Sequence, residues 1–220
     1  MGKKVIITGA TGMVGEGVMR QCLADPEIDK VLLAGRRSSG FSHPKIEELI
    51  LPDMFNCQIL TTVAADYDAC LFCLGVSSVG MNEKDYTRLT YDLTIVFASV
   101  LQSANPSLIF CYVSGVATDS TEKGRSMWAR VKGRTENKLI SMFSSAYMFR
   151  PGYMQPDREA KNTLKYYKFV RGLYPLLRLL FPAYVCSLAD LGRAMVYCVT
   201  QGYHKNVLEV ADIRLIGEKQ

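Results

Sequence analysis

Three glycines, Gly9, Gly12 and Gly15, have the spacing of a turn that binds the pyrophosphate of a dinucleotide. They follow an apolar run at 4–7 and precede another at 14–23, so they mark the passage from a strand to a helix. Gly9 allows the tight turn, Gly12 lets backbone approach the phosphates, and Gly15 lets the helix pack closely. The free N–H groups of the helix would then face the phosphate charge. The other contacts expected in this turn are Thr11, Met13 and Val14. A purely structural glycine turn is the alternative, and the strand-to-helix position favours the dinucleotide site.

A pair of arginines, Arg36 and Arg37, ends the next apolar run at 30–35. Arg36 lies 21 residues after Gly15, where the dinucleotide-binding fold places the group that contacts the adenosine ribose. An acidic side chain there suits the 2′-hydroxyl of NAD, whereas guanidinium groups match the 2′-phosphate of NADP. The pair therefore favours NADP(H) over a solvated pair at a strand end.

Strand-like and helix-like periods alternate along the chain, which predicts an α/β fold with a doubly wound, mostly parallel Rossmann-type sheet and helices on both faces. We expect one domain over 1–220, with a small helical C-terminal lobe on the substrate side at 153–186. The expected strands are 4–9, 30–35, 46–51, 69–75, 108–114, 146–149 and 207–210. The expected helices are 13–24, 86–104, 127–143 and 187–199, the last with Ser187 as its N-cap.

Composition narrows the classes of function. The chain of 220 residues is 49% hydrophobic with a net charge of +5, and its basic residues are spread out, so nucleic-acid binding has no specific support. Most of the seven cysteines lie in apolar runs and the two histidines are far apart, so we expect no metal site. Buried thiols and a first strand at the N-terminus predict a cytoplasmic protein. The apolar stretch at 173–185 is too short to span a membrane.

Further along the chain, Ser114 ends a strand and Lys132 lies one helical turn after Trp128. With the glycine turn, with Leu74-Gly75 and with Arg150-Pro151-Gly152, these residues resemble the short-chain dehydrogenase/reductase superfamily over nearly the whole chain. The runs 131–136 and 149–152 are similar to its atypical branch around the human Tat-interacting oxidoreductase, whose bacterial members are often labelled nucleoside-diphosphate-sugar epimerases. The chain thus resembles the NAD-dependent epimerases and dehydratases.

The resemblance implies roles for particular residues. Ser114 would polarise a substrate carbonyl and Lys132 would bind the nicotinamide ribose. The family's catalytic tyrosine corresponds to Trp128, whose indole N–H only donates hydrogen bonds and cannot act as a general acid or base. Carried over with the family's cofactor are Asp53 and Met54 beside the adenine, Leu74, Gly75 and Val76 toward the ribose and nicotinamide, and Pro151 and Gly152 near the nicotinamide.

The missing tyrosine leaves two hypotheses open. In the first, another group supplies the proton; Tyr153, just after Gly152, is the best candidate, and Tyr112 shares a strand face with Ser114 unless it belongs to the core. In the second, the chain binds NADP(H) without turnover. Each residue also has a structural alternative: Trp128 as a packed pocket wall, Ser114 as a strand-end hydroxyl, and Lys132 as a surface lysine.

The leading hypothesis is an NADP-dependent oxidoreductase, or a nucleotide-sugar-epimerase-like enzyme, that acts on a small-molecule substrate such as a carbonyl compound or a sugar nucleotide. The alternative is a non-catalytic NADPH-sensing regulator or assembly factor that works through protein partners. Basic and aromatic residues alternate with leucines at 165–185, which is typical either of a helix resting on a membrane surface or, as we prefer, of a pocket helix pair or a homodimer contact.

Overall fold

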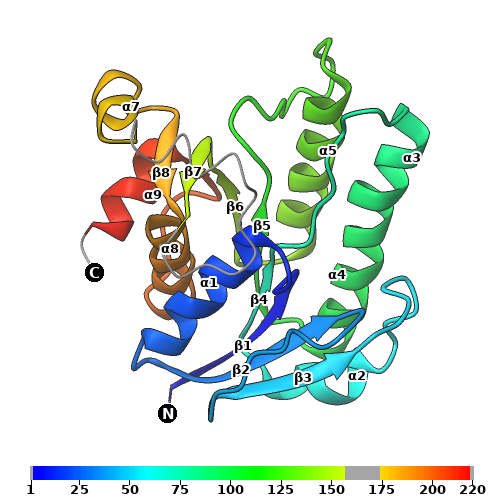
Figure 1. Cartoon of the computed structure of the whole chain (residues 1–220). Coiled ribbons are helices and arrows are strands. Elements are labelled where there is room, and N and C mark those ends of the chain that lie inside the picture. The colour runs from blue at the N-terminus through cyan, green and yellow to red at the C-terminus, as the bar shows by residue number, and fades with distance from the viewer. Residues whose placement is uncertain (1, 157–173, 219–220) are drawn as a thin grey trace.

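A seven-stranded parallel sheet forms the centre of the molecule (Figure 1). The computed structural model describes residues 2–156 and 174–218. The strand order is β3-β2-β1-β4-β5-β6-β9. The strands are β1 (Lys3–Thr8), β2 (Ile28–Gly35), β3 (Ile46–Ile50), β4 (Ala69–Phe72), β5 (Ile109–Val113), β6 (Ala146–Arg150) and β9 (Val207–Glu209). The direction of chain progression reverses between β1 and β4, and in such sheets ligands bind outside the carboxyl ends of the strands at this point.

Alternating side chains of each strand fill two separate cores. In β1, Val5 and Ile7 belong to one apolar cluster and Ile6 belongs to the other, because successive residues of a strand face opposite sides of the sheet. Both faces of the sheet are therefore covered, which explains why inner strands such as β4 and β5 are continuous apolar runs, whereas the edge strand β3 contains Glu47 and Glu48.

Helices cover both faces of the sheet (Figure 1). Helices α1 (Met13–Ala24), α8 (Leu188–Thr200) and α9 (Val210–Gly217) contribute to the first cluster. Helices α2 (Leu60–Val63), α4 (Leu93–Ala104) and α5 (Met127–Met142) contribute to the second. A short α3 (Glu83–Thr87) continues into α4 through a π-helical turn at Arg88–Asp92, and a 3₁₀ turn occupies Ala64–Asp66.

The C-terminal lobe begins with a second, two-stranded parallel sheet. Strand β7 (Tyr153–Gln155) pairs with β8 (Val185–Ser187), and α7 (Tyr174–Leu180) precedes β8. Ser187 then caps α8, because its side chain accepts a hydrogen bond from the N–H of Asp190 while the Asp190 carboxylate accepts one from the N–H of Ser187.

The structure confirms the predicted fold class, each predicted strand within a few residues, and Ser187 as the N-cap. Four features differ from the expectation. The lobe expected to be helical contains β7 and β8, and α9 follows the last strand. Helix α2 was not expected, and the helix expected at 86–104 begins at α3 and includes a π turn. Residues 157–173 of the expected helical lobe lie outside the described residues. In the described ranges, no helix combines the length and apolarity that crossing a bilayer requires.

Candidate functional site

The glycine turn between β1 and α1 depends on two positions that cannot carry a side chain. Gly9 has a φ of +72°, and a Cβ atom there would lie 2.8 Å from the carbonyl oxygen of Cys73. A Cβ atom at Gly15 would lie 2.2 Å from the carbonyl oxygen of Gly9, so the first turn of α1 packs directly on the turn that precedes it. The backbone thus closes tightly, and the N–H of Gly12 donates to the Gly9 carbonyl over 2.9 Å.

The start of α1 offers N–H groups to an anion. Gly12 is its N-cap and forms no side-chain capping bond, whereas Ser187 caps α8 and Asn82 caps α3 with their side chains. The first N–H groups of a helix have no partner inside the helix, and the helix dipole favours negative charge there. This arrangement fits a phosphate group.

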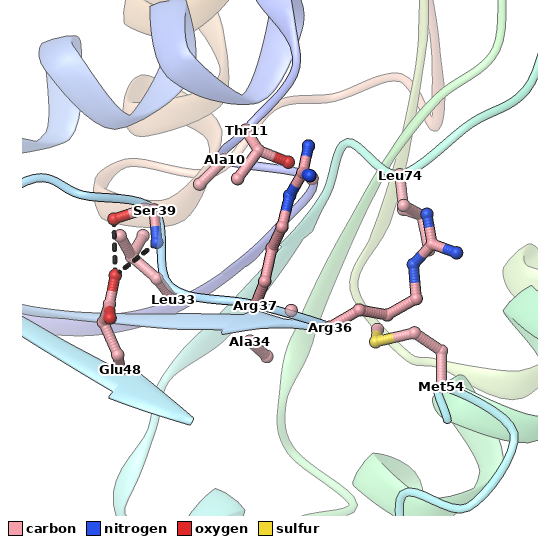
Figure 2. Close-up of a pocket in the computed structure, with 12 residues that line it drawn as sticks. Ala10, Thr11, Leu33, Ala34, Arg36, Arg37, Ser39, Glu48, Met54 and Leu74 are labelled. Carbon is pink, nitrogen blue, oxygen red and sulfur yellow. Dashed lines mark hydrogen bonds between the residues drawn. The ribbon is translucent and has the colours of Figure 1, made fainter. Parts of the chain in front are cut away.

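A cavity of about 370 Å³ lies beside this turn, at the carboxyl ends of β1 and β2 (Figure 2). In Figure 2 the side chain of Arg37 points toward Thr11 and that of Arg36 extends toward Leu74. Both arginines are exposed, and within 2–156 and 174–218 neither forms an ion pair. The predicted residues that line this cavity are Gly9, Thr11, Arg36, Arg37, Met54 and Leu74.

An acidic residue that the sequence did not suggest also lines this cavity. The Glu48 carboxylate accepts hydrogen bonds from the backbone N–H of Ser39 at 2.7 Å and from the Ser39 hydroxyl at 2.5 Å (Figure 2). These bonds, with a further one from Ser38, lower the pKa of Glu48 from its usual value. The negative charge holds the segment after the arginine pair in place. The sequence signal that could have identified Glu48 is an acidic residue inside the predicted strand 46–51.

A second cavity, of about 390 Å³, adjoins the first and shares Arg36, Met54 and Leu74 with it. Its other predicted lining residues are Asp53, Gly75 and Val76. Lining residues not predicted are Pro52, Phe55, Arg88, Leu89 and Leu93. The Arg88 guanidinium lies 5.5 Å from the centre of the Phe55 ring, and Arg88 opens the π-helical turn, so a helix irregularity lies at the wall of this cavity. Its apolar lining suits a flat aromatic ring.

Lys132 is held at the end of β5. It is half-buried on α5, and its ammonium group donates a hydrogen bond to the backbone carbonyl of Ser114. Burial lowers the pKa of Lys132 to about 8, and the nearby Glu136 carboxylate offsets part of this effect. The structure therefore brings Ser114 and Lys132 together, and the surface-lysine interpretation does not fit.

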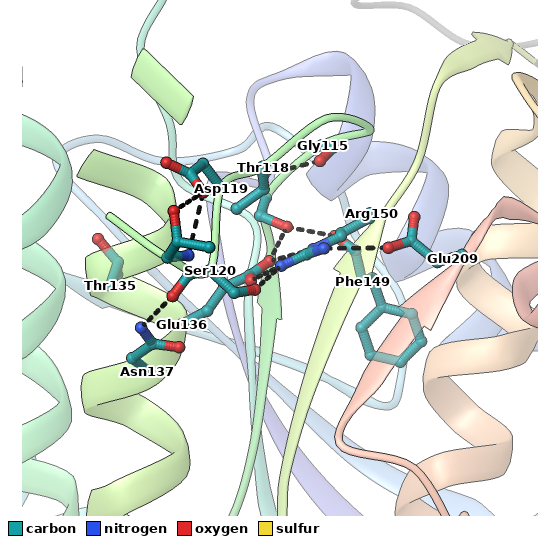
Figure 3. A network of polar contacts seen from close by, with 12 residues as sticks. Gly115, Thr118, Asp119, Ser120, Thr135, Glu136, Asn137, Phe149, Arg150 and Glu209 are labelled. Carbon is teal, nitrogen blue, oxygen red and sulfur yellow. Dashed lines mark hydrogen bonds and ion pairs between the residues drawn. The ribbon is translucent and has the colours of Figure 1, made fainter. Parts of the chain in front are cut away.

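A buried ion pair joins Glu136 and Arg150 (Figure 3). The fully buried Glu136 on α5 accepts hydrogen bonds from Arg150 Nε at 3.1 Å and Nη2 at 2.5 Å. Arg150, at the end of β6, also donates to Glu209 at 3.0 Å and to Ser120 at 2.5 Å. The network joins α5, β6 and β9 at the carboxyl end of the sheet. The sequence signal for this network is Glu136, an acidic residue on the buried face of the helix predicted at 127–143.

The Ser114 hydroxyl belongs to this network. Its oxygen lies 2.5 Å from Glu136 Oε1 and 3.1 Å from the backbone carbonyl of Phe149, and both of these atoms are acceptors. A hydroxyl has one proton to donate, and the shorter contact to an ionised carboxylate takes it. In this arrangement Ser114 offers a lone pair to a ligand, and its proton points away toward Glu136.

The three aromatic candidates occupy different environments. Trp128 is half-buried on α5, one turn before Lys132. The Tyr153 hydroxyl on β7 donates to Gln155 Oε1 at 3.2 Å. Tyr112 is only 2% exposed, its ring lies 6.2 Å from that of Phe72, and burial raises its pKa far above the usual value, so it belongs to the core.

The remaining predicted residues support the backbone around the site. Gly12, Met13 and Val14 form the start of α1 outside the lining of both cavities. The carbonyl of Pro151 accepts a hydrogen bond from Val116 N–H at 2.9 Å. A Cβ atom at Gly152 would lie 2.1 Å from the carbonyl oxygen of Tyr184, so this glycine permits β7 to lie against the chain before β8.

The loop between β5 and α5 is fastened to the helix that carries Lys132. A Cβ atom at Gly133 would lie 1.8 Å from the carbonyl oxygen of Asp119, so helix and loop are in direct backbone contact. The Asn137 side chain donates to the carbonyl of Ser120 at 3.0 Å. Ala117 has a φ of +67°, an uncommon conformation for a residue with a side chain.

Metal and thiol chemistry find no support in the described residues. No group of three histidine, cysteine or acidic side chains there could hold a metal ion. Cys70 and Cys73 have a C-x-x-C spacing, but Cys70 belongs to one core cluster and Cys73 packs against the other. Burial raises the pKa of Cys73 to about 12 and that of Cys70 well above the usual value, so both thiols are protonated.

Solved structures share the fold at low sequence identity. A short-chain dehydrogenase/reductase from Saccharomyces cerevisiae superposes with a TM-score of 0.68 at 12% identity and covers 98% of this chain and 99% of its own. A UDP-N-acetylglucosamine 4-epimerase from Methanobrevibacter ruminantium gives 0.67 at 15% identity, covering 94% and 75%.

Curated relatives are also distant in sequence. FMP52 of Lodderomyces elongisporus is 23% identical over 238 residues, covering 98% of this chain and 96% of its own. HTATIP2 of Rattus norvegicus is 25% identical over 161 residues, covering 71% and 65%. The FMP52 proteins are named mitochondrial, which contradicts the cytoplasmic location expected above. That expectation drew on buried thiols and the first residues alone, and neither feature distinguishes one reducing compartment from another.

The matching family model agrees with this geometry. The model described as the NAD dependent epimerase/dehydratase family matches residues 5–164, which include the glycine turn, both cavities and the Ser114–Lys132 pair. The chain therefore belongs to the NAD-dependent epimerase/dehydratase family.

Proposed function

We propose that this protein is an atypical short-chain oxidoreductase that uses NADP(H). The observation that carries the choice of NADP(H) is the exposed pair Arg36 and Arg37 at the end of β2, beside the uncapped start of α1. Two guanidinium groups at the position of the adenosine ribose supply the charge that a 2′-phosphate requires.

The cofactor would be held by the start of α1, the arginine pair, the second cavity and Lys132. The N–H groups at the start of α1 bind the pyrophosphate, Arg36 and Arg37 bind the 2′-phosphate, and the second cavity, with Met54 in its wall, takes the adenine. Lys132 binds the hydroxyls of the nicotinamide ribose. The bound nicotinamide supplies hydride exchange, and the side chains around it orient the substrate and move the proton.

The substrate end of the site differs from that of a tyrosine-dependent enzyme. The donors on α5 are the Lys132 ammonium and the Trp128 indole, while Ser114 offers an acceptor because its proton is directed to Glu136. The site thus favours a small substrate that presents both a carbonyl oxygen and a hydroxyl, such as a sugar nucleotide. Tyr153 is the proposed proton donor.

Titration of the purified protein with NADPH and NADH tests the cofactor, with fluorescence of Trp128, the single tryptophan, as the signal. Arg36→Met should weaken NADPH about ten- to a hundredfold, the value of one charge-assisted hydrogen bond, and leave NADH unchanged. Lys30→Met is the matched control, because it removes one charge from the far end of the same strand. Equal losses for both nucleotides would refute the 2′-phosphate contact.

A second candidate function is an NADPH-sensing regulator. It is favoured by one observation: Trp128 occupies the tyrosine position and the Ser114 proton is engaged by Glu136, so neither group is poised to protonate a carbonyl. A sensor must bind the two redox forms with different affinity, since only a differential affinity shifts a conformational equilibrium. Equal affinity for NADPH and NADP⁺ together with turnover of any carbonyl substrate would exclude it.

A further inference from the structure

An acidic side chain shares the first cavity with the arginine pair. Among the described residues that line this cavity, Glu48 is the one carboxylate, and Figure 2 shows it in the same lining as Arg36 and Arg37. Glu48 comes from the edge strand β3, whose register with β2 places it opposite Leu33, another lining residue. A cavity with the charge to bind a phosphate therefore contains a fixed negative charge of its own.

The charge of Glu48 is held by a serine and not by an arginine. The N–H and the hydroxyl of Ser39 both donate to the same carboxylate oxygen, Oε1, at 2.7 and 2.5 Å. Hydrogen bonds from Ser39 and Ser38 lower the pKa of Glu48, so the carboxylate is ionised at neutral pH. Across residues 2–156 and 174–218 no lysine or arginine forms an ion pair with Glu48. Its charge is thus not neutralised by the neighbouring arginines.

The two donors of Ser39 also suit a phosphate. An N–H and a hydroxyl that converge on one anionic oxygen form charge-assisted hydrogen bonds with a carboxylate or with a phosphate. A hydroxyl has only one proton to donate, so Ser39 cannot donate it to Glu48 and to a ligand at the same time. A phosphate that enters the cavity would also be repelled by the carboxylate, because like charges in a shared site repel. Glu48 therefore opposes a phosphate by occupying these donors and by adding negative charge.

We propose that Glu48 is a specificity-determining residue that weakens binding of the 2′-phosphate and so limits the preference for NADPH over NADH. The proposal rests on the proposed function, since it requires the dinucleotide to occupy this cavity. The 2′-hydroxyl of NADH is neutral, so NADH leaves Ser39 bonded to Glu48. Specificity is a difference between two affinities, and a repulsive group in the site lowers one of them.

Calorimetric titration of the full-length protein with NADPH and with NADH tests the proposal. Glu48→Gln removes the charge and keeps an amide oxygen that accepts from Ser39. This variant should bind NADPH about three- to tenfold more tightly and NADH as the wild type does. Glu47→Gln is the matched control, because Glu47 precedes Glu48 on β3, pairs with Lys30 at 2.7 Å and lies outside both cavities. It removes the same charge from the opposite face of the sheet and should leave both affinities unchanged. Both glutamates are exposed, and thermal unfolding should confirm that each variant is folded.

Other outcomes overturn the proposal. If Glu48→Gln binds NADPH no more tightly than the wild type, the carboxylate does not oppose the phosphate. Equal tightening of NADPH and NADH would show that the effect does not involve the 2′-phosphate, and an equal effect of Glu47→Gln would assign it to net charge. The proposed function fails separately. If the wild type prefers NADH and only Glu48→Gln prefers NADPH, the choice of NADP(H) as cofactor is wrong and the role of Glu48 stands.

Discussion

Replacing Lys132 by methionine should change the pH dependence of stability. In the unfolded chain the lysine keeps its ordinary pKa of 10.5, while burial lowers it to about 8 in the folded protein. Between these two pH values the unfolded state holds a proton that the folded state lacks, so the free energy of unfolding rises with pH. The shift in pKa corresponds to about 3 kcal/mol in the free energy of unfolding. The buried lysine lowers the free energy of unfolding by this amount at neutral pH, and the effect disappears above both pKa values.

The assay is urea unfolding of the wild type and Lys132→Met from neutral pH to pH ~10.5, the upper end being the ordinary lysine pKa. The free energy of unfolding of the wild type, minus that of the variant, should increase by about 3 kcal/mol across this range, because every other titrating group cancels. Lys138→Met, on the exposed face of the same helix, is the control for removal of a lysine from α5. A difference that does not change with pH for Lys132→Met would refute the buried ammonium group at Ser114.

Three further predictions concern stability. Glu136→Gln should lower the free energy of unfolding by about 3 kcal/mol, because the buried charge of Arg150 then keeps only Glu209 as a carboxylate partner. The double variant Glu136→Leu/Arg150→Met should recover most of the lost free energy in urea unfolding, because it leaves no buried charge unpaired. Gly133→Ala should cost about 1–3 kcal/mol and shift the melting temperature down by several degrees, since its Cβ atom must displace the Asp119 carbonyl; an unchanged melting temperature would contradict that contact. Ser187→Ala should cost about 1 kcal/mol through loss of the α8 cap, and Ser187→Asp, which caps equally well, should not.

Most of the sheet could be predicted because the signals were local. The apolar run at 69–75 and the glycine turn at 9–15 identify a strand and a strand-to-helix junction from adjacent residues. Strands β7 and β8 could not be predicted, since each spans three residues and each is defined by pairing with the other rather than by its own pattern. Helix α9 was missed because its apolar positions follow a strand without an intervening turn signal.

The parts of the site that could be predicted are those where the backbone admits only glycine or where a charged pair follows a clear strand. Gly9 and Gly15 are required by backbone contacts, and the arginine pair ends a recognisable strand. The direction of the Ser114 proton was not predictable. It depends on Glu136, 22 residues away in sequence, and a long-range pair of this kind leaves no periodic trace in a single sequence. Tyr112 shows the same limit, because its strand position left open whether it faced the site or the core.

The pairing of β7 with β8 holds the two ends of the intervening chain close together. Because the two strands are parallel, the chain that leaves β7 after Gln155 comes back at Val185, directly beside Tyr153. The entropic cost of closing such an excursion grows only slowly with its length. Because β7 and β8 form a sheet of their own, a change in the length of the chain between them leaves the strand order of the seven-stranded sheet unaltered.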